Sequence, residues 1–168
     1  IITYDSSVSD KHFLESVRMS DTTKKNLVII DECHNFISNT LSNMTSKTGK
    51  RALTIYEHII QEKKETDTTR VILLSGTPVV NNPYELAIMF NLLRPGIFPS
   101  TEAKFNEEYI STINGQKQIS LDKRNMFQRR ILGLVSYYTG ADPNLFASKT
   151  VHTKKLVMSK FQADAYDE

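Results

Sequence analysis

Two runs of consecutive apolar residues are the clearest pattern in this sequence. Residues 27–30 (Leu-Val-Ile-Ile) and residues 71–74 (Val-Ile-Leu-Leu) each contain four apolar side chains without a polar interruption. Such runs are typical of parallel strands that are buried on both faces, so we predict two strands of this kind. Residues 1–4 and 150–158 are two further β-prone segments, for which we also predict strands.

Apolar residues spaced three and four positions apart predict helices between and after these strands. One helix is expected after Ser9 and another from Ala52. A third is expected over residues 84–93, where Asn82 can cap the helix and Glu85 occupies the capping-box position. Three further helical patterns cover residues 101–112, residues 120–136 and a segment after Ser159, which has Gln162 at capping-box spacing.

One long polar segment, residues 39–51, is rich in Ser, Thr, Asn and Lys, and for it we predict a mobile loop. The alternation of predicted strands and helices elsewhere favours an α/β fold built on a parallel sheet. The ligand site of such a sheet lies at the carboxyl ends of its strands. The residues that follow the two apolar runs are therefore the candidates for function.

The composition suits a single domain, since the 168 residues are 39% hydrophobic and 24% charged. The net charge of +2 is too small to indicate nucleic-acid binding by itself. The single cysteine, Cys33, excludes a disulfide framework and a cysteine-based zinc site, and it suggests a reducing compartment. No apolar run approaches the ~20 residues that a membrane-spanning helix needs, and we expect no membrane partner.

The first candidate site is the segment from Asp31 to His34, which directly follows the first apolar run. Mg²⁺ favours one or two carboxylates together with phosphate oxygens and water, and Asp31 can supply such a carboxylate. Glu32 can orient an attacking water and accept its proton. His34 can pass the state of the nucleotide to neighbouring elements through a hydrogen bond. The alternative is a polar strand end without chemistry, and Cys33 is interpreted as a small buried residue rather than a nucleophile.

The second candidate site is the turn after the second apolar run, which consists of Ser75, Gly76, Thr77 and Pro78. Gly76 permits a tight backbone path and Pro78 makes it rigid. Taken alone, this is a common kind of turn. Its position at a strand end, about forty residues after an acidic segment at another strand end, makes the pair specific.

At this point the sequence resembles a known family. Residues 74–86 (Leu-Ser-Gly-Thr-Pro-Val-Val-Asn-Asn-Pro-Tyr-Glu-Leu) resemble the third helicase motif of superfamily 2 in its Swi/Snf form, and residues 92–98 continue the likeness. A narrower resemblance is to the nucleoside triphosphatase I family of large cytoplasmic DNA viruses. It rests on residues 28–38, 91–96, 133–138 and 157–160, with Gln162 and Tyr166.

The resemblance implies a partial first motor lobe with a RecA-like parallel sheet flanked by helices. Residues 1–150 would be the C-terminal part of that lobe, and residues 151–168 would begin the connection to a second lobe. The parent protein would be a DNA-dependent ATPase that uses ATP and Mg²⁺ in viral transcription, in elongation or transcript release. Its partners would be DNA and, as a further candidate, a viral RNA polymerase. It would act in the host cytoplasm or in the virion.

The resemblance also assigns roles to individual residues. Asp31 would hold the magnesium ion and Glu32 would activate water, with His34 beside them. The turn residues Ser75, Gly76, Thr77 and Pro78 would couple hydrolysis to DNA movement. Thr3 and Tyr4 would lie near the DNA backbone, although Tyr4 could equally belong to the core.

Several features depart from the complete motor. The sequence contains no Gly-x-x-x-x-Gly-Lys-Ser/Thr phosphate loop, and the second lobe with its arginine finger is not included. Both ends of the sequence suggest a fragment, which we expect to be inactive alone. The alternatives are a non-hydrolysing scaffold within a viral transcription complex and a related early-transcription-factor ATPase subunit.

Two clusters of basic residues leave phosphate contacts open. Lys47, Lys50 and Arg51 lie in the polar segment, where a solvated loop is the alternative. Arg129 and Arg130 lie in a predicted helix, where Arg130 could instead flank the core.

Overall fold

The computed structural model describes residues 1–4, 6–19, 25–66, 68–79, 81–113, 115–138, 140, 147–148 and 150–167. The chain divides into two compact units, Ile1–Val135 and Ser136–Glu168, which are considered separately below. The boundary predicted at residue 150 concerns the lobes of a complete motor, and it stays a prediction.

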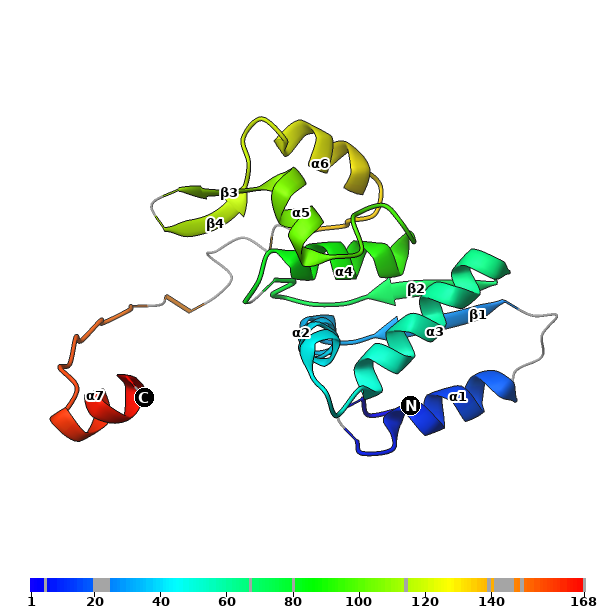
Figure 1. Cartoon of the computed structure of the whole chain (residues 1–168), viewed down its shortest axis with the longest axis horizontal. Coiled ribbons are helices and arrows are strands. Elements are labelled where there is room, and N and C mark those ends of the chain that lie inside the picture. Colours follow the sequence, from blue (N-terminus) through cyan, green and yellow to red (C-terminus); the bar gives the residue numbers. More distant parts are fainter. Residues whose placement is uncertain are drawn as a thin grey trace. The chain divides into compact units, whose positions relative to one another are not determined.

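The first unit is built around two parallel strands, β1 (Asn26–Ile30) and β2 (Thr69–Leu73), whose arrows point the same way in Figure 1. Val28 pairs with Val71 at the centre of the register. The connection between the strands contains two helices, α2 (Cys33–Thr45) and α3 (Arg51–Glu65). The predicted α/β fold with a parallel sheet is therefore confirmed.

The prediction that both strands are buried on both faces is wrong. Residues on one face of the sheet, such as Val28 and Val71, pack against the core. On the other face the side chains are open to solvent, with Leu27 59% exposed and Ile29 57% exposed. Strand side chains alternate between the two faces, and α3 and α4 (Tyr84–Leu93) pack against β2. The apolar runs could not reveal this, because both faces carry apolar residues.

The polar segment predicted as a mobile loop is mostly helical, and this prediction is also wrong. Residues up to Thr45 belong to α2, where Phe36, Ile37 and Thr40 are buried. The buried hydroxyl of Thr40 donates a hydrogen bond to the Phe36 carbonyl oxygen at 2.8 Å. A polar side chain can therefore face the core at helical spacing, because its hydrogen-bonding capacity is met within the helix.

The helices predicted around the sheet are otherwise confirmed. Helix α1 (Ser9–Arg18) begins at Ser9 itself, and the rings of its Phe13 and of His58 in α3 meet edge to face, with 5.8 Å between their centroids. Helix α3 buries the apolar stripe that predicted it. Helix α4 has the predicted bounds, and the Asn82 side-chain oxygen accepts a hydrogen bond from the Tyr84 N–H at 2.9 Å.

Two other helix predictions were too long. Helix α5 (Glu102–Tyr109) ends where strand β3 (Ile110–Ile113) begins, and β3 pairs antiparallel with β4 (Gln116–Ile119). The sequence Asn114-Gly115 between them is a common hairpin turn signal, and Gly115 has a φ of +77°. Helix α6 (Arg124–Ile131) covers only the middle of residues 120–136 and is followed by Gly133 at φ +79°.

The second unit contains helix α7 (Lys160–Asp167). Its predicted capping box is confirmed, since the Ser159 N–H donates to Gln162 Oε1 at 3.1 Å and the Gln162 N–H donates to Ser159 Oγ at 3.3 Å. The strands predicted for residues 1–4 and 150–158 are wrong, because neither segment has a partner strand within the described ranges. None of the helices that the structure describes has both the length and the apolar character to cross a membrane.

Candidate functional site

The acidic segment lies at the carboxyl end of β1. The strand ends at Ile30, Asp31 and Glu32 form a turn, and α2 begins at Cys33. Both carboxylate side chains are exposed. The Glu32 N–H donates a hydrogen bond to Asp31 Oδ1 at 3.0 Å, so the turn holds the Asp31 carboxylate in a defined position.

Glu32 has a left-handed backbone conformation, with φ 46° and ψ 46°, and no other non-glycine residue in the described ranges has a positive φ. This conformation costs about 1–2 kcal/mol for a residue with a Cβ atom. The Glu32 carbonyl oxygen accepts hydrogen bonds from the Asn35 N–H at 3.0 Å and from the Tyr4 hydroxyl at 3.3 Å. Strain that is stabilised in this way is common at functional sites.

The left-handed turn leads to a stability prediction for two variants that both lose the carboxylate. Glu32→Gly should be more stable than Glu32→Ala by about 1 kcal/mol, because glycine adopts positive φ without a Cβ penalty. Thermal unfolding of the two full-length variants measures the difference. Equal stability, or a more stable alanine variant, would show that the turn is not left-handed.

The second strand end is joined to the first by backbone hydrogen bonds. The Leu74 N–H donates to the Ile30 carbonyl oxygen at 2.9 Å, and the Cys33 N–H donates to the Leu74 carbonyl oxygen at 2.9 Å. The two chain segments thus stay hydrogen-bonded to each other beyond the ends of β1 and β2. As a result, Ser75 lies beside the start of α2, although it is 41 residues from His34 in the sequence.

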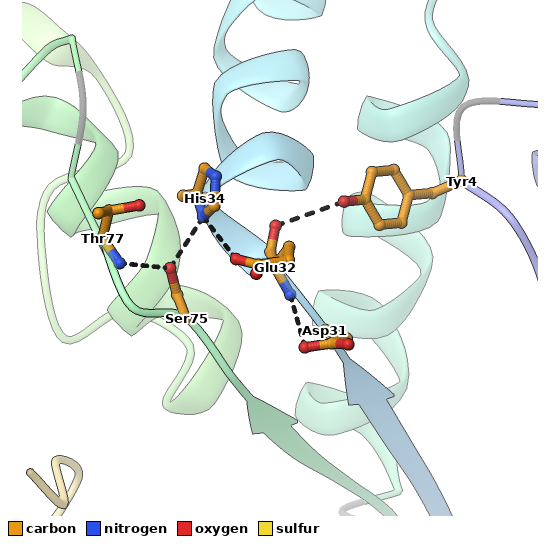
Figure 2. A network of polar contacts seen from close by, with 6 residues as sticks. All are labelled: Tyr4, Asp31, Glu32, His34, Ser75 and Thr77. Atoms are coloured by element: carbon orange, nitrogen blue, oxygen red, sulfur yellow. Dashed lines mark hydrogen bonds and ion pairs between the residues drawn. The ribbon is translucent and has the colours of Figure 1, made fainter. Parts of the chain in front are cut away.

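The His34 ring contacts both candidate motifs through one nitrogen atom (Figure 2). His34 Nδ1 lies 2.8 Å from Ser75 Oγ and 3.3 Å from Glu32 Oε2. Ser75 Oγ in turn accepts a hydrogen bond from the Thr77 N–H at 3.0 Å. The His34 side chain is 19% exposed and the Glu32 side chain 61%, so a partly buried ring holds a carboxylate that is open to solvent.

The backbone of Gly76 has an ordinary conformation, and its part in the coupling motif stays a prediction. Its φ is not in the left-handed region, and no atom lies within 4 Å of the position that a Cβ would take. The structure therefore gives no conformational reason for a glycine here. Pro78 completes the turn without a cis peptide bond.

A pocket of about 440 Å³ opens beside His34 and separates the start of α2 from the residues after the Ser75 turn. Sequence reasoning did not identify most of its lining. Asn35 and Ser38 follow His34 near the start of α2, and Val79 and Asn81 follow Thr77 in the chain. The lining consists of His34, Asn35, Ser38, Thr77, Val79 and Asn81.

The Cys33 side chain is buried, with 2% of its surface exposed. Burial, followed by the negative charge of Glu32, raises the pKa of the Cys33 thiol. A buried thiol that keeps its proton is a poor nucleophile. The interpretation of Cys33 as a structural residue is therefore confirmed.

Thr3 and Tyr4 differ in their surroundings. Thr3 is exposed, whereas the Tyr4 ring packs edge-on against Phe36 of α2, with 6.1 Å between the ring centroids. Figure 2 shows the Tyr4 hydroxyl pointing toward the Glu32 backbone. Tyr4 therefore packs against the core, as the alternative interpretation held.

The donor set at the acidic turn fits a magnesium ion that is held mainly by its nucleotide. Among residues with a described position, no group of three or more His, Cys, Asp or Glu side chains could enclose a metal. Mg²⁺ commonly needs only one or two carboxylates when phosphates and water complete its shell. Asp31 accepts the Glu32 N–H with one oxygen, which leaves its second oxygen for a cation.

Comparison with known proteins places the whole chain in a recognised group. The family model described as "SNF2-related domain" matches residues 1–168. "Putative ATP-dependent RNA helicase R350" of Acanthamoeba polyphaga mimivirus is 50% identical over 163 residues, which are 97% of this chain and 20% of the relative. Nucleoside triphosphatase I of Melanoplus sanguinipes entomopoxvirus is 28% identical over 173 residues, 99% of this chain and 26% of the relative. The chain therefore spans only about a fifth to a quarter of these relatives.

Proposed function

The chain belongs to the SNF2-related domain family of superfamily 2 helicases, and from this we propose that it carries the hydrolytic part of an ATP-driven nucleic-acid motor. Members of this family have ATP-dependent helicase or ATPase activity, and the α/β unit described above is consistent with a partial RecA-like lobe. One observation carries the proposal. A single nitrogen of His34 contacts Glu32 at the first strand end and Ser75 at the second.

We propose that Asp31 and Glu32 divide the hydrolytic chemistry between them. Asp31 would hold Mg²⁺, which when bound offsets the charge of the phosphate oxygens. Glu32 would orient the attacking water and accept its proton. The exposure of both carboxylates supports these roles, because a nucleotide and a water molecule must reach them.

We further propose that His34 couples hydrolysis to nucleic-acid movement. A shift of the Glu32 carboxylate during turnover changes the environment of His34 Nδ1, which also contacts Ser75 Oγ. Ser75 Oγ accepts the Thr77 N–H, so the change would reach the turn backbone. The residues after this turn line the pocket beside His34, which gives the turn space to move.

The coupling proposal predicts a selective defect in Ser75→Ala. This variant loses the contact with His34 and the acceptor for the Thr77 N–H. In the full-length protein we expect basal ATP hydrolysis to persist, while stimulation by nucleic acid falls by about tenfold, the factor that corresponds to one hydrogen bond of about 1.4 kcal/mol. Phosphate release with and without nucleic acid measures both quantities.

Ser38→Ala is the matched control, because Ser38 lines the same pocket and its side chain makes no hydrogen bond to either motif within the described residues. It should keep both basal and stimulated activity. If Ser75→Ala retains full stimulation, the turn does not couple the two events. If it loses basal activity as well, Ser75 acts in hydrolysis itself.

The proposed nucleic acid is DNA, and the proposed setting is viral transcription, in elongation or transcript release. The support is the 28% identity with a protein named nucleoside triphosphatase I. RNA is the second candidate, because the 50% identical relative carries the name of an RNA helicase. Competition between DNA and RNA of the same sequence for the full-length protein distinguishes the two. The same proposal includes a viral RNA polymerase as partner. It also includes a reducing location, such as the host cytoplasm or the virion.

A further inference from the structure

We propose that helix α6 carries a second nucleic-acid contact, at which Arg129 and Asn125 bind a backbone phosphate away from the ATP motifs. The inference rests on the proposed function for the identity of the partner. Its site is a pocket of about 450 Å³ on the outer side of α6. The pocket is lined by Asp122, Asn125, Met126, Arg129 and Arg130.

The segment around α6 has the charge that a phosphate partner requires. The lining of the pocket contains two cationic side chains, Arg129 and Arg130, and one carboxylate, Asp122. The carboxylate, Asp122, accepts a hydrogen bond from the Ser120 hydroxyl and lies 3.8 Å from Lys123 Nζ. The negative charge in the pocket is therefore already compensated by its neighbours.

Packing on the inner side of α6 fixes how the helix presents its outer side. Phe127 is buried and stacks on Phe98, with 5.0 Å between the ring centroids. The Arg130 guanidinium donates to the Ile97 carbonyl oxygen and lies 5.8 Å from the Tyr109 ring centroid. Arg130 thus flanks the core, as one sequence interpretation held, and it keeps a fixed positive charge at the edge of the pocket.

Arg129 has a different environment from Arg130. It is exposed, and its side chain makes no hydrogen bond, ion pair or ring contact in the described part of the chain. Arginine is well suited to phosphate because its planar guanidinium can donate two parallel hydrogen bonds. The Asn125 amide lies one helical turn earlier in the same pocket and adds a neutral donor.

The remaining chemistry of the pocket favours a nucleic-acid backbone over an isolated anion. Met126 is 37% exposed and offers an apolar surface beside the two guanidinium groups. A sugar or base attached to the bound phosphate can pack on such a surface. In Figure 1, α6 is separated from the start of α2 by α4 and α5, so the contact is distinct from the ATP motifs.

The test compares two arginine variants of the full-length protein. Arg124 lies on the same helix and is also exposed, but it is about 140° around the helix axis from Arg129 and does not line the pocket. Arg129→Ala should weaken nucleic-acid binding by about tenfold and reduce the salt dependence of the affinity by about one phosphate contact. Arg124→Ala should leave both quantities within about twofold of the wild type. Fluorescence anisotropy with a labelled DNA duplex and a labelled single strand, at several salt concentrations, measures them.

Two results would overturn the inference. One is equal weakening of nucleic-acid binding by the two variants, which indicates non-specific charge. The other is unchanged nucleic-acid affinity in Arg129→Ala. In that second case, Arg129-dependent binding of a polyglutamate peptide would indicate an acidic protein partner.

Failure of this inference is distinguishable from failure of the proposed function. If the full-length protein hydrolyses ATP but Arg129→Ala binds nucleic acid normally, only the α6 contact is lost. If Arg129→Ala weakens binding in a protein that hydrolyses no ATP, the contact stands and the proposed function does not.

Discussion

Glu32→Gln in the full-length protein is expected to lower ATP turnover by a factor of at least about 100 while leaving ATP binding intact, because general-base catalysis contributes roughly 10²–10⁴-fold. Glutamine has the size of glutamate and keeps an oxygen that can face His34 Nδ1, which lies 3.3 Å from Glu32 Oε2. It cannot take a proton from water. Steady-state phosphate release and equilibrium binding of a fluorescent ATP analogue measure the two properties separately.

Glu107→Gln is the matched control for this substitution. Glu107 is an exposed glutamate of α5, outside both motifs, and its conversion should change neither turnover nor binding. Normal turnover in Glu32→Gln would remove Glu32 from the hydrolytic step. Loss of ATP binding would instead indicate that the carboxylate holds the nucleotide.

The second large effect concerns the aromatic cluster that supports α4, α5 and α6. Phe98 is 3% exposed, and its ring centroid lies 5.3 Å from that of Tyr109 and 5.8 Å from that of Phe105. Phe98→Ala should lower the free energy of unfolding by about 3–5 kcal/mol, because it removes a large buried ring and leaves a cavity. Differential scanning calorimetry of the full-length protein should show the transition that contains this domain at a temperature lower by about 10 °C.

Leu121→Ala provides the control for the Phe98 prediction, since Leu121 is 66% exposed and its truncation creates no cavity. Its transition temperature should match that of the wild type. A shift in Phe98→Ala as small as that of Leu121→Ala would mean that the aromatic cluster does not stabilise the domain. The Phe98 N–H donates a hydrogen bond to Asn91 Oδ1, and the Phe98 carbonyl oxygen accepts one from Asn91 Nδ2. Because both bonds use the Phe98 backbone, the substitution leaves them in place.

Local sequence signals predicted the elements that they directly control. Helix α4 has the predicted bounds because the Asn82 side chain accepts the Tyr84 N–H and Pro83, with a φ of −54°, suits the start of a helix. The capping box at Ser159 and Gln162 formed for the same reason. The nearness of the two motifs was also predictable in principle, because the carboxyl ends of neighbouring parallel strands meet at one edge of the sheet.

Features that depend on tertiary contacts were not predictable in this way. The left-handed turn at Glu32 has no sequence signal, since glutamate does not favour positive φ. The hydrogen bond from Tyr4 to Glu32 joins residues that are 28 positions apart. The exposed face of the sheet has the same apolar residues as the covered face, so only the arrangement of helices distinguishes them.

Two errors could have been avoided from the sequence itself. The Asn114-Gly115 pair after the β-branched residues of segment 110–113 is a hairpin signal, and it indicates that the helix predicted over residues 101–112 ends before Ile110. The polar segment before Thr45 contains apolar side chains at helical spacing, which its overall polarity concealed. In both cases the spacing of a few residues was more informative than the composition of the segment.

We propose above all that this chain provides the hydrolytic residues of a nucleic-acid-dependent ATPase. The most direct measurement is the rate of phosphate release by the full-length protein at saturating ATP and Mg²⁺, titrated with DNA and, in parallel, with RNA. We expect a rate that rises to a plateau with at least one of the two nucleic acids, and no such rise in Glu32→Gln. A rate that neither nucleic acid changes, or a rise that persists in Glu32→Gln, would contradict the proposal.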